Sequence, residues 1–154
     1  MEIRQLKREE LGEAARVVRG AFATVAAEFG LTEENCPTNG AFLPEGRLEA
    51  QFDAGAFDGD VMIGFAALDL SDAEKPELEK LSVLPQSRHQ GAGKLLVGWA
   101  AEQARAAGAA ALRIGIIEEN VRLRTWYEGL GFVHTGTRVF AHLPFTVGFM
   151  ELPI

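Results

Sequence analysis

The stretch "LSVLPQSRHQGAGKLL", residues 81–96, places two glycines directly before an apolar run with helical spacing. Glycine weakens the interior of a helix, so Gly91 and Gly93 need another reason to stand here. A tight backbone bend, or the close approach of a ligand to the backbone, would supply that reason. The first turn of a helix offers unpaired N–H groups and the positive end of the helix dipole, and both attract phosphate. The stretch therefore predicts an anion site at the start of a helix.

Two well-known phosphate-binding loops do not fit this stretch. A Walker loop requires Ser or Thr after its lysine, and here Leu95 follows Lys94. A dinucleotide-binding loop requires a third glycine, where this chain has Leu96, and it begins directly after its strand. Here seven residues separate Val83 from Gly91. A purely structural role, in which the two glycines end a turn, stays open at this point.

The residues before the glycines predict a strand that carries carboxylates. The run "ELEKLSVL", residues 77–84, alternates with a period of two. Because side chains alternate between the two faces of a strand, one face would carry Glu77, Glu79, Leu81 and Val83.

The rest of the chain is predicted to alternate between strands and helices. The clearest helix lies over residues 11–29, where apolar residues recur at steps of three and four until Gly30. A second helix is expected from Gly91 or Gly93 to about residue 107, and residues 31–46 predict a long irregular connection. The other expected elements are strands at 3–6, 55–57, 61–70, 111–117, 132–140 and 145–152, and short helices at 46–52 and 120–132. This order predicts a mixed α/β domain.

Composition limits the classes of protein. The 154 residues suffice for one domain with a real core, and we expect a single domain over residues 1–154. The 15 basic and 22 acidic residues give a net charge of −7 without a basic cluster, so nucleic acid is not an expected partner. The chain shows no apolar leader and no apolar run of membrane length, so we expect no membrane association and a cytoplasmic location. Cys36, the only cysteine, fits a reducing compartment, and we expect an ordinary loop residue.

Two segments of the chain carry motifs in a fixed order. The first pattern, R/Q-x-x-G-x-G/A after a strand, is filled by Arg88, Gly91 and Gly93. The second pattern, N-x-x-x-x-x-x-Y-x-x-x-G-F, is filled by Asn120, Tyr127, Gly131 and Phe132. On these motifs, from about residue 78 to residue 132, the chain resembles the GNAT family of N-acetyltransferases. The resemblance implies a single GNAT-type α/β domain with a mixed, mostly antiparallel sheet of about six or seven strands flanked by helices.

The resemblance also implies acetyl-CoA as the acyl donor. In this family the strand that matches residues 78–83 splays from the strand that matches 111–117, and the pantetheine arm lies in the gap. The arm would pair with the backbone of Leu81, Ser82 and Val83. The pyrophosphate would lie on the N–H groups of His89, Gln90, Gly91, Ala92, Gly93 and Lys94, where a side chain at either glycine would obstruct it. Arg88 or Lys94 would add charge or stay solvated, and Asn120 would bind the cofactor, cap its helix, or do both.

Acetyl transfer to an amine needs a base, a donor to the oxyanion and an acid. An alkyl ammonium with a pKa near ~10 must lose its proton before it attacks. By the resemblance, Glu79 is the first candidate base and Glu77 the second, with a surface role as the alternative for both. Tyr127 matches the family's tyrosine and suits the acid, because a phenol stays protonated at neutral pH; ring packing is its alternative. A strand N–H, that of Val83, would meet the oxyanion.

The acceptor and the assembly are less constrained by the motifs. Net acidity favours a cationic amine on a small molecule or a peptide. The histidines at 89, 134 and 142 have no ligand spacing, so no metal is expected. A CoA or acyl-CoA sensor without turnover, and an acyl group other than acetyl, stay open as alternatives. The apolar last strand within 145–154 would either pair with a second copy, as a homodimer, or be covered within one chain.

Overall fold

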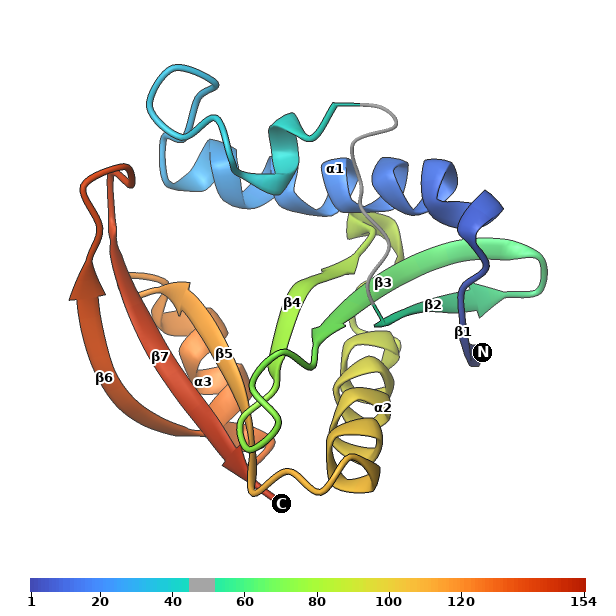
Figure 1. The fold of residues 1–154 in the computed structure, drawn as a ribbon. Coiled ribbons are helices and arrows are strands. Elements are labelled where there is room, and N and C mark those ends of the chain that lie inside the picture. The colour runs from blue at the N-terminus through green and yellow to red at the C-terminus, as the bar shows by residue number, and fades with distance from the viewer. Residues whose placement is uncertain (45–51) are drawn as a thin grey trace.

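The computed structural model describes residues 1–44 and 52–154, in which seven strands form one sheet (Figure 1). The strands are β1 (Glu2–Gln5), β2 (Phe52–Asp58), β3 (Val61–Asp69), β4 (Glu77–Val83), β5 (Ala111–Ile117), β6 (Val133–Val139) and β7 (Thr146–Pro153). The α-helices are α1 (Leu11–Glu28), α2 (Ala92–Ala106) and α3 (Val121–Gly129), and the short 3-10 helices are η1 (Arg8–Glu10), η2 (Gly40–Phe42) and η3 (Pro85–Ser87). The strand order is β1-β2-β3-β4-β5-β7-β6, and every neighbouring pair except β4–β5 is antiparallel. The predicted α/β class with a mixed, mostly antiparallel sheet is confirmed.

Most described elements lie within a few residues of their predicted positions. β2 is longer than predicted and begins at Phe52, and the rest of the helix predicted over 46–52 lies outside the described residues. β7 lies between β5 and β6, so the alternative in which the last strand is covered within one chain is the right one. The other alternative, in which this strand forms an exposed sheet edge that pairs with a second copy, is therefore wrong. No helix in the described ranges is long and apolar enough to cross a membrane.

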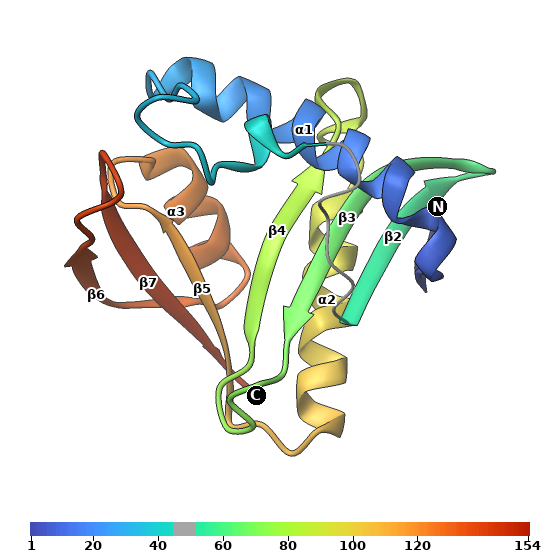
Figure 2. The same ribbon diagram turned by 45° about the horizontal axis from the view of Figure 1, so that its top comes forward.

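Helices cover both faces of the sheet (Figures 1 and 2). On one face, which we call the α1 face, α1 packs on β3 through a buried cluster that includes Val17, Val18, Met62, Phe65 and Ala67. On the opposite face, which we call the α2 face, α2 and α3 share a larger buried cluster that includes Leu68, Leu78, Leu96, Ile114 and Tyr127. Each strand side chain can therefore be assigned to a face by the cluster that it joins.

β4 carries a β-bulge at Lys80. The φ angle of Lys80 is 51°, in the left-handed region that residues other than glycine rarely adopt. The pairing with β3 shifts by one residue here, because Ser82 lies opposite Phe65 whereas Glu79 lies opposite Ala67. The Ser82 hydroxyl donates a hydrogen bond to the Lys80 carbonyl at 2.8 Å and so holds the bulge. The extra residue reverses the alternation of side chains along the strand.

The bulge makes the predicted common face of β4 wrong. Regular alternation would place Glu77, Glu79, Leu81 and Val83 together. Instead, Glu79 lies opposite Ala67 on the α1 face, whereas Leu81 and Val83 pack against the cluster on the α2 face. The strand therefore presents its carboxylates to one side of the sheet and its later apolar residues to the other.

β4 and β5 diverge after a single ladder pair. Glu77 pairs with Arg113, and the Arg113 N–H donates to the Pro76 carbonyl at 2.8 Å. Within the described ranges no later residue of β4 pairs with β5, although β5 pairs with β7 from Ala111 to Ile117. Figures 1 and 2 show the two strands separating toward their carboxyl ends. Backbone groups at this gap are thus left for a partner other than a strand of the sheet.

The substitution Lys80→Val tests the bulge through stability. Valine favours regular strands, so in an ordinary β-strand the substitution would be neutral or stabilising. At a φ of 51° a β-branched residue is strained, and we expect the free energy of unfolding to fall by about 1–3 kcal/mol. Lys80→Gly relieves the backbone strain, so it is expected to be more stable than the valine variant. Urea denaturation of the three proteins measures this, and a valine variant as stable as the native chain would contradict the bulge.

Candidate active site

The loop after β4 leaves the start of α2 open to a ligand. Gly91 precedes the first turn of α2 with a φ of 90°, and no side chain caps the helix. The Leu95 N–H bonds to the Gly91 carbonyl at 3.1 Å, so the N–H groups of residues 92–94 have no acceptor within the helix. His89 and Gln90 form the turn before the helix, with a positive φ of 64° at His89. The predicted anion-binding residues thus meet at one helix start.

Glycine is favoured at positions 91 and 93 of this loop for two different physical reasons. Gly91 adopts a positive φ, and a Cβ built on it would meet nothing within 4 Å. A Cβ on Gly93 would lie 3.2 Å from the indole of Trp126 in α3. Gly93 therefore lets α3 approach the first turn of α2, which is a packing role that the sequence did not reveal. The Trp126 side chain stays 38% exposed beside this contact.

Arg88 holds the loop against β4 and α1. Its Nε donates to the Val83 carbonyl at 3.2 Å, and its Nη2 donates to the Ala21 carbonyl and the Thr24 hydroxyl, both at 3.0 Å. The guanidinium is therefore engaged by protein acceptors and fixes the loop to α1. Lys94 is exposed on the first turn of α2. Of the two cations predicted for a phosphate, Lys94 is the one whose side chain extends into solvent.

The N–H of Val83 faces the gap between β4 and β5. Its neighbour Leu84 donates to the Ile63 carbonyl on the β3 side at 2.9 Å. Backbone groups alternate in direction along a strand, so the Val83 N–H points away from β3 and toward β5. This is the N–H that we expected, with the family resemblance, to meet the oxyanion.

Tyr127 lies on the side of α3 that faces the sheet. The residue is 5% exposed, and its ring meets those of Trp126 and Phe132 edge to face, with centroids 4.9 and 5.1 Å apart. Burial raises the pKa of the hydroxyl above its ordinary value, so the phenol stays protonated at neutral pH. The described part of the chain supplies no hydrogen bond to this hydroxyl. Packing of the ring and availability of the proton are therefore compatible.

Glu77 and Glu79 lie on the α1 face at the foot of the gap. Glu77 stands beside Asp69 of β3 and Arg113 of β5. Burial raises the pKa of Glu77, and the neighbouring charge of Glu79 adds to this effect. The Glu79 carboxylate lies 3.6 Å from Nζ of Lys80, and its side chain is 28% exposed. Glu79 is the closer of the two to the bulge.

Asn120 takes the capping role that was one of its alternatives. Its side-chain oxygen accepts a hydrogen bond from the Leu123 N–H at 3.2 Å, at the start of α3. α2 differs from α3 in this respect, because α2 begins without a side-chain cap. Of these two helices, α2 is therefore the one whose N-terminus carries no side-chain cap.

The histidines do not meet in one place. His89 lies in the loop before α2, His142 lies between β6 and β7, and His134 of β6 contacts the Glu118 carboxylate at 2.9 Å. In residues 1–44 and 52–154 no three side chains of His, Cys, Asp or Glu are grouped to hold a metal ion.

The loop after α1 forms a third buried cluster that the sequence did not reveal. The cluster joins the end of α1, the loop, the end of β5 and the turn before β7, and its members include Ala26, Leu31, Cys36, Ile117 and Phe145. Burial raises the pKa of the Cys36 thiol, which fits the predicted ordinary role. The loop shows no periodic pattern, so the sequence signalled only an irregular connection. In the structure the loop packs against the end of β5 at Ile117.

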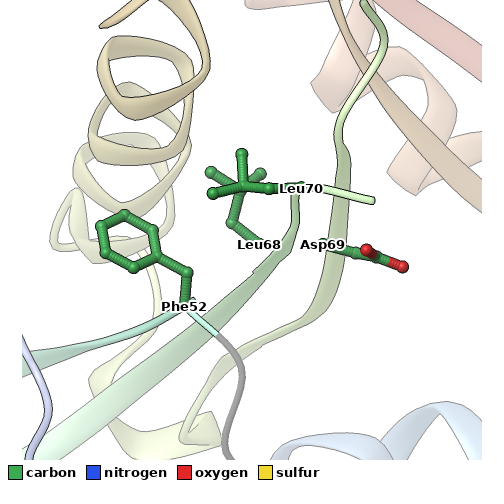
Figure 3. Close-up of a pocket in the computed structure, with 4 residues that line it drawn as sticks. All are labelled: Phe52, Leu68, Asp69 and Leu70. Carbon is green, nitrogen blue, oxygen red and sulfur yellow. The ribbon is translucent and has the colours of Figure 1, made fainter. Parts of the chain in front are cut away.

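A shallow pocket lies beside the start of β4, since Asp69, which lines it, pairs with Glu77. It is lined by Phe52, Leu68, Asp69 and Leu70, at the start of β2 and the end of β3 (Figure 3). The Phe52 ring stacks on Trp99 of α2, with centroids 5.3 Å apart. None of the residues predicted for catalysis or cofactor binding lines this pocket.

The fold is similar to those of solved acetyltransferases. The Paia N-acetyltransferase of Thermoplasma acidophilum, in complex with coenzyme A, has a TM-score of 0.75 and 22% identity over 99% of this chain and 98% of its own. The ribosomal-protein-S18-alanine N-acetyltransferase of Escherichia coli has a TM-score of 0.73 and 20% identity over 99% and 93%. A putative acetyltransferase of Salmonella typhimurium, with acetyl-CoA, has a TM-score of 0.71 and 16% identity over 99% and 93%.

The sequence comparison identifies the family. No curated protein sequence matches the chain. The sequence model of the acetyltransferase (GNAT) family matches residues 26–132, which is more than half of the chain and includes both motifs. The chain therefore belongs to the GNAT family of acetyltransferases, as its two motifs predicted.

Proposed function

We propose that residues 1–154 form a single catalytic domain that transfers an acetyl group from acetyl-CoA to a primary amine in one ternary complex. The observation that carries the proposal is the gap between β4 and β5, which opens beside the uncapped start of α2. An extended arm with amide groups and a phosphate end is chemically complementary to such a place, because strand backbone pairs with amides and helix N-termini bind phosphate.

Acetyl-CoA would bind with its arm along β4. The backbone of residues 81–83 pairs with the amides of the pantetheine arm, and the pyrophosphate lies on the N–H groups of residues 89–94. Lys94 adds positive charge there, whereas Arg88 holds the loop in place through its contacts with α1. Similar folds hold coenzyme A in the Thermoplasma acidophilum enzyme and acetyl-CoA in the Salmonella typhimurium protein, which supports this donor.

The transfer would proceed by direct attack of the amine. Glu79, or alternatively Glu77, removes a proton from the ammonium group, directly or through a water molecule. The amine nitrogen then bonds to the thioester carbon, and the Val83 N–H stabilises the charge that develops on the oxygen. As the carbon–sulfur bond breaks, Tyr127 donates its proton to the CoA thiolate, and the second proton that leaves the amine nitrogen as the amide forms returns through water to the Tyr127 phenolate. The products are the acetylated amine and CoA.

The acceptor would be a cationic amine on a small molecule or a peptide. The net charge of −7 and the carboxylates of Glu77 and Glu79 at the gap both favour a positively charged partner. The Escherichia coli enzyme of similar fold is named for a protein alanine, which supports a peptide amine as one class to test.

Release of CoA from acetyl-CoA with a panel of amines tests the proposed function. The panel contains spermidine, kanamycin, a lysine-bearing peptide and a peptide with a free N-terminal alanine. We expect release with at least one of them, and a decrease in kcat of about 10²–10⁴-fold in Tyr127→Phe, because general acid catalysis contributes on that order. Thermal melting of the variant controls for folding. No release with any amine, together with tight binding of acetyl-CoA, would favour the sensor alternative.

Binding of acetyl-CoA should depend on Gly91. In Gly91→Ala the left-handed backbone is strained, so the loop shifts away from the geometry that presents its N–H groups. We expect the Kd for acetyl-CoA to rise about tenfold, a change that calorimetry resolves, because about 1.4 kcal/mol corresponds to that factor. Gly98→Ala is the matched control, because a Cβ there meets nothing within 4 Å and the residue lies on the exposed side of α2. Equal affinities for both variants would contradict the assignment.

The two glutamates can be separated by their amide variants. We expect Glu79→Gln to lower kcat/KM by about 10²-fold or more, and Glu77→Gln to have a smaller effect. The pH dependence of kcat/KM decides whether Glu79 or Glu77 is the base. Because the pKa of Glu77 is raised, a Glu77 base would lose activity as the pH falls through a value above that of an ordinary glutamate. An acidic limb of that kind, abolished in Glu77→Gln and retained in Glu79→Gln, would transfer the role to Glu77.

A further inference from the structure

Gly115 is an exposed residue without a side chain in a central strand of the sheet. It lies in the middle of β5, between the buried Ile114 and Ile116, and yet it is exposed. Those two neighbours pack into the cluster on the α2 face, so Gly115 belongs to the opposite, α1 face. An exposed residue at the centre of a seven-stranded sheet marks a place where nothing in the described chain covers that face.

Neither the backbone nor the packing requires a glycine at this position. Gly115 is not among the glycines with a positive φ. A Cβ on it would lie 3.4 Å from Cγ1 of Val147 and 4.0 Å from Cε1 of Phe149, which are ordinary contact distances. At two other strand glycines a Cβ would be crowded, because it would lie 2.8 Å from Leu6 at Gly55 and 3.0 Å from Leu96 at Gly64.

A glycine without a structural reason is costly in a strand. It orders a flexible residue and brings no side chain to pack against its neighbours. Glycine in a strand interior often marks a site where a ligand approaches the backbone closely.

Gly115 lies across the gap from Glu79. The one ladder pair between the strands joins Glu77 to Arg113, and two residues further along each parallel strand lie Glu79 and Gly115. Both are on the α1 face, since Glu79 lies opposite Ala67 of the cluster under α1. Beyond the Glu77–Arg113 pair the ladder ends, and Figure 2 shows β4 and β5 separating toward their carboxyl ends. The uncovered backbone of β5 therefore faces the candidate base across the opening.

We propose that Gly115 sets the acceptor specificity of the site: the carbon that bears the amine passes over its backbone, between Glu79 and an apolar wall of Val147 and Phe149. This inference rests on the proposed amine acceptor. The chemistry of the place selects a primary amine on a narrow apolar chain, because the carboxylate attracts the ammonium group while the wall accepts methylene carbons. A side chain at position 115 would occupy the volume of that carbon.

The variants Gly115→Ala and Gly115→Val fill the opening stepwise. One methylene group in a binding site changes selectivity by about 10–200-fold, so we expect the KM for the amine to rise about tenfold in the alanine variant and further in the valine variant. The KM for acetyl-CoA should stay within about twofold, because the donor arm pairs with β4. Gly98→Ala, which makes the same chemical change on the exposed side of α2, should match the native chain.

The measurement is initial-rate kinetics with every amine of the panel that the native chain acetylates, with thermal melting as a folding control. The alanine variant decides if the valine variant fails to fold, because a Cβ fits at ordinary contact distances. An unchanged KM for the amine in the folded variants, or an equal rise of both KM values, would overturn the inference and leave the acetyltransferase intact. A native chain that acetylates no amine would overturn the proposed acceptor and this inference together.

Discussion

The inserted residue at Lys80 is the constraint on which the site depends. One residue in the left-handed conformation shifts the register of β4 against β3 and reverses the faces of all residues that follow. The same strand leaves β5 after the Glu77–Arg113 pair. A sheet that interrupts its pairing at the centre loses several hydrogen bonds between backbone groups, so such a break is retained where another partner takes the freed groups. In this fold the freed groups include the Val83 N–H, which stands at the centre of the site.

The two faces of the sheet respond differently to this break. On the α2 face one buried cluster continues beneath the gap, since it joins Leu68 and Leu78 of the first strands to Ile114 and Met150 of the last ones. On the α1 face the buried residues divide into two clusters, one under α1 and one around the loop that follows it. One continuous buried cluster therefore spans both halves on the α2 face, whereas on the α1 face the halves are linked only through α1 and the loop that follows it. In the proposed function, an acceptor reaches a donor bound along β4 from the α1 face, and Arg88 ties the loop before α2 to α1.

Sequence patterns predicted the parts of this architecture that depend on local chemistry. Helical periodicity located α1, and two motifs located the start of α2 and the helix with Tyr127. The bulge escaped prediction because Lys80 carries no sign of a left-handed backbone, so alternation placed Leu81 and Val83 on the wrong face. The partner of Arg88 was equally hidden, since Ala21 and Thr24 lie more than sixty residues earlier in the chain and only the fold brings them to the guanidinium. The loop at residues 31–44 packs through contacts that no short pattern encodes.

The glycines of this chain show that a sequence motif gives the position of a residue but not the physical reason for which that residue is needed. Gly91 answers a backbone demand, since its φ of 90° would strain any other residue. Gly93 answers a packing demand, because a Cβ there would lie only 3.2 Å from the Trp126 indole. Gly115 answers neither, although in the sequence it stands in an ordinary strand. The motif includes the first two and omits the third. In the proposed function the motif residues bind the donor and Gly115 shapes the space for the acceptor, so the role of Gly115 is inferred from exposure and contact distances in the fold rather than from a motif.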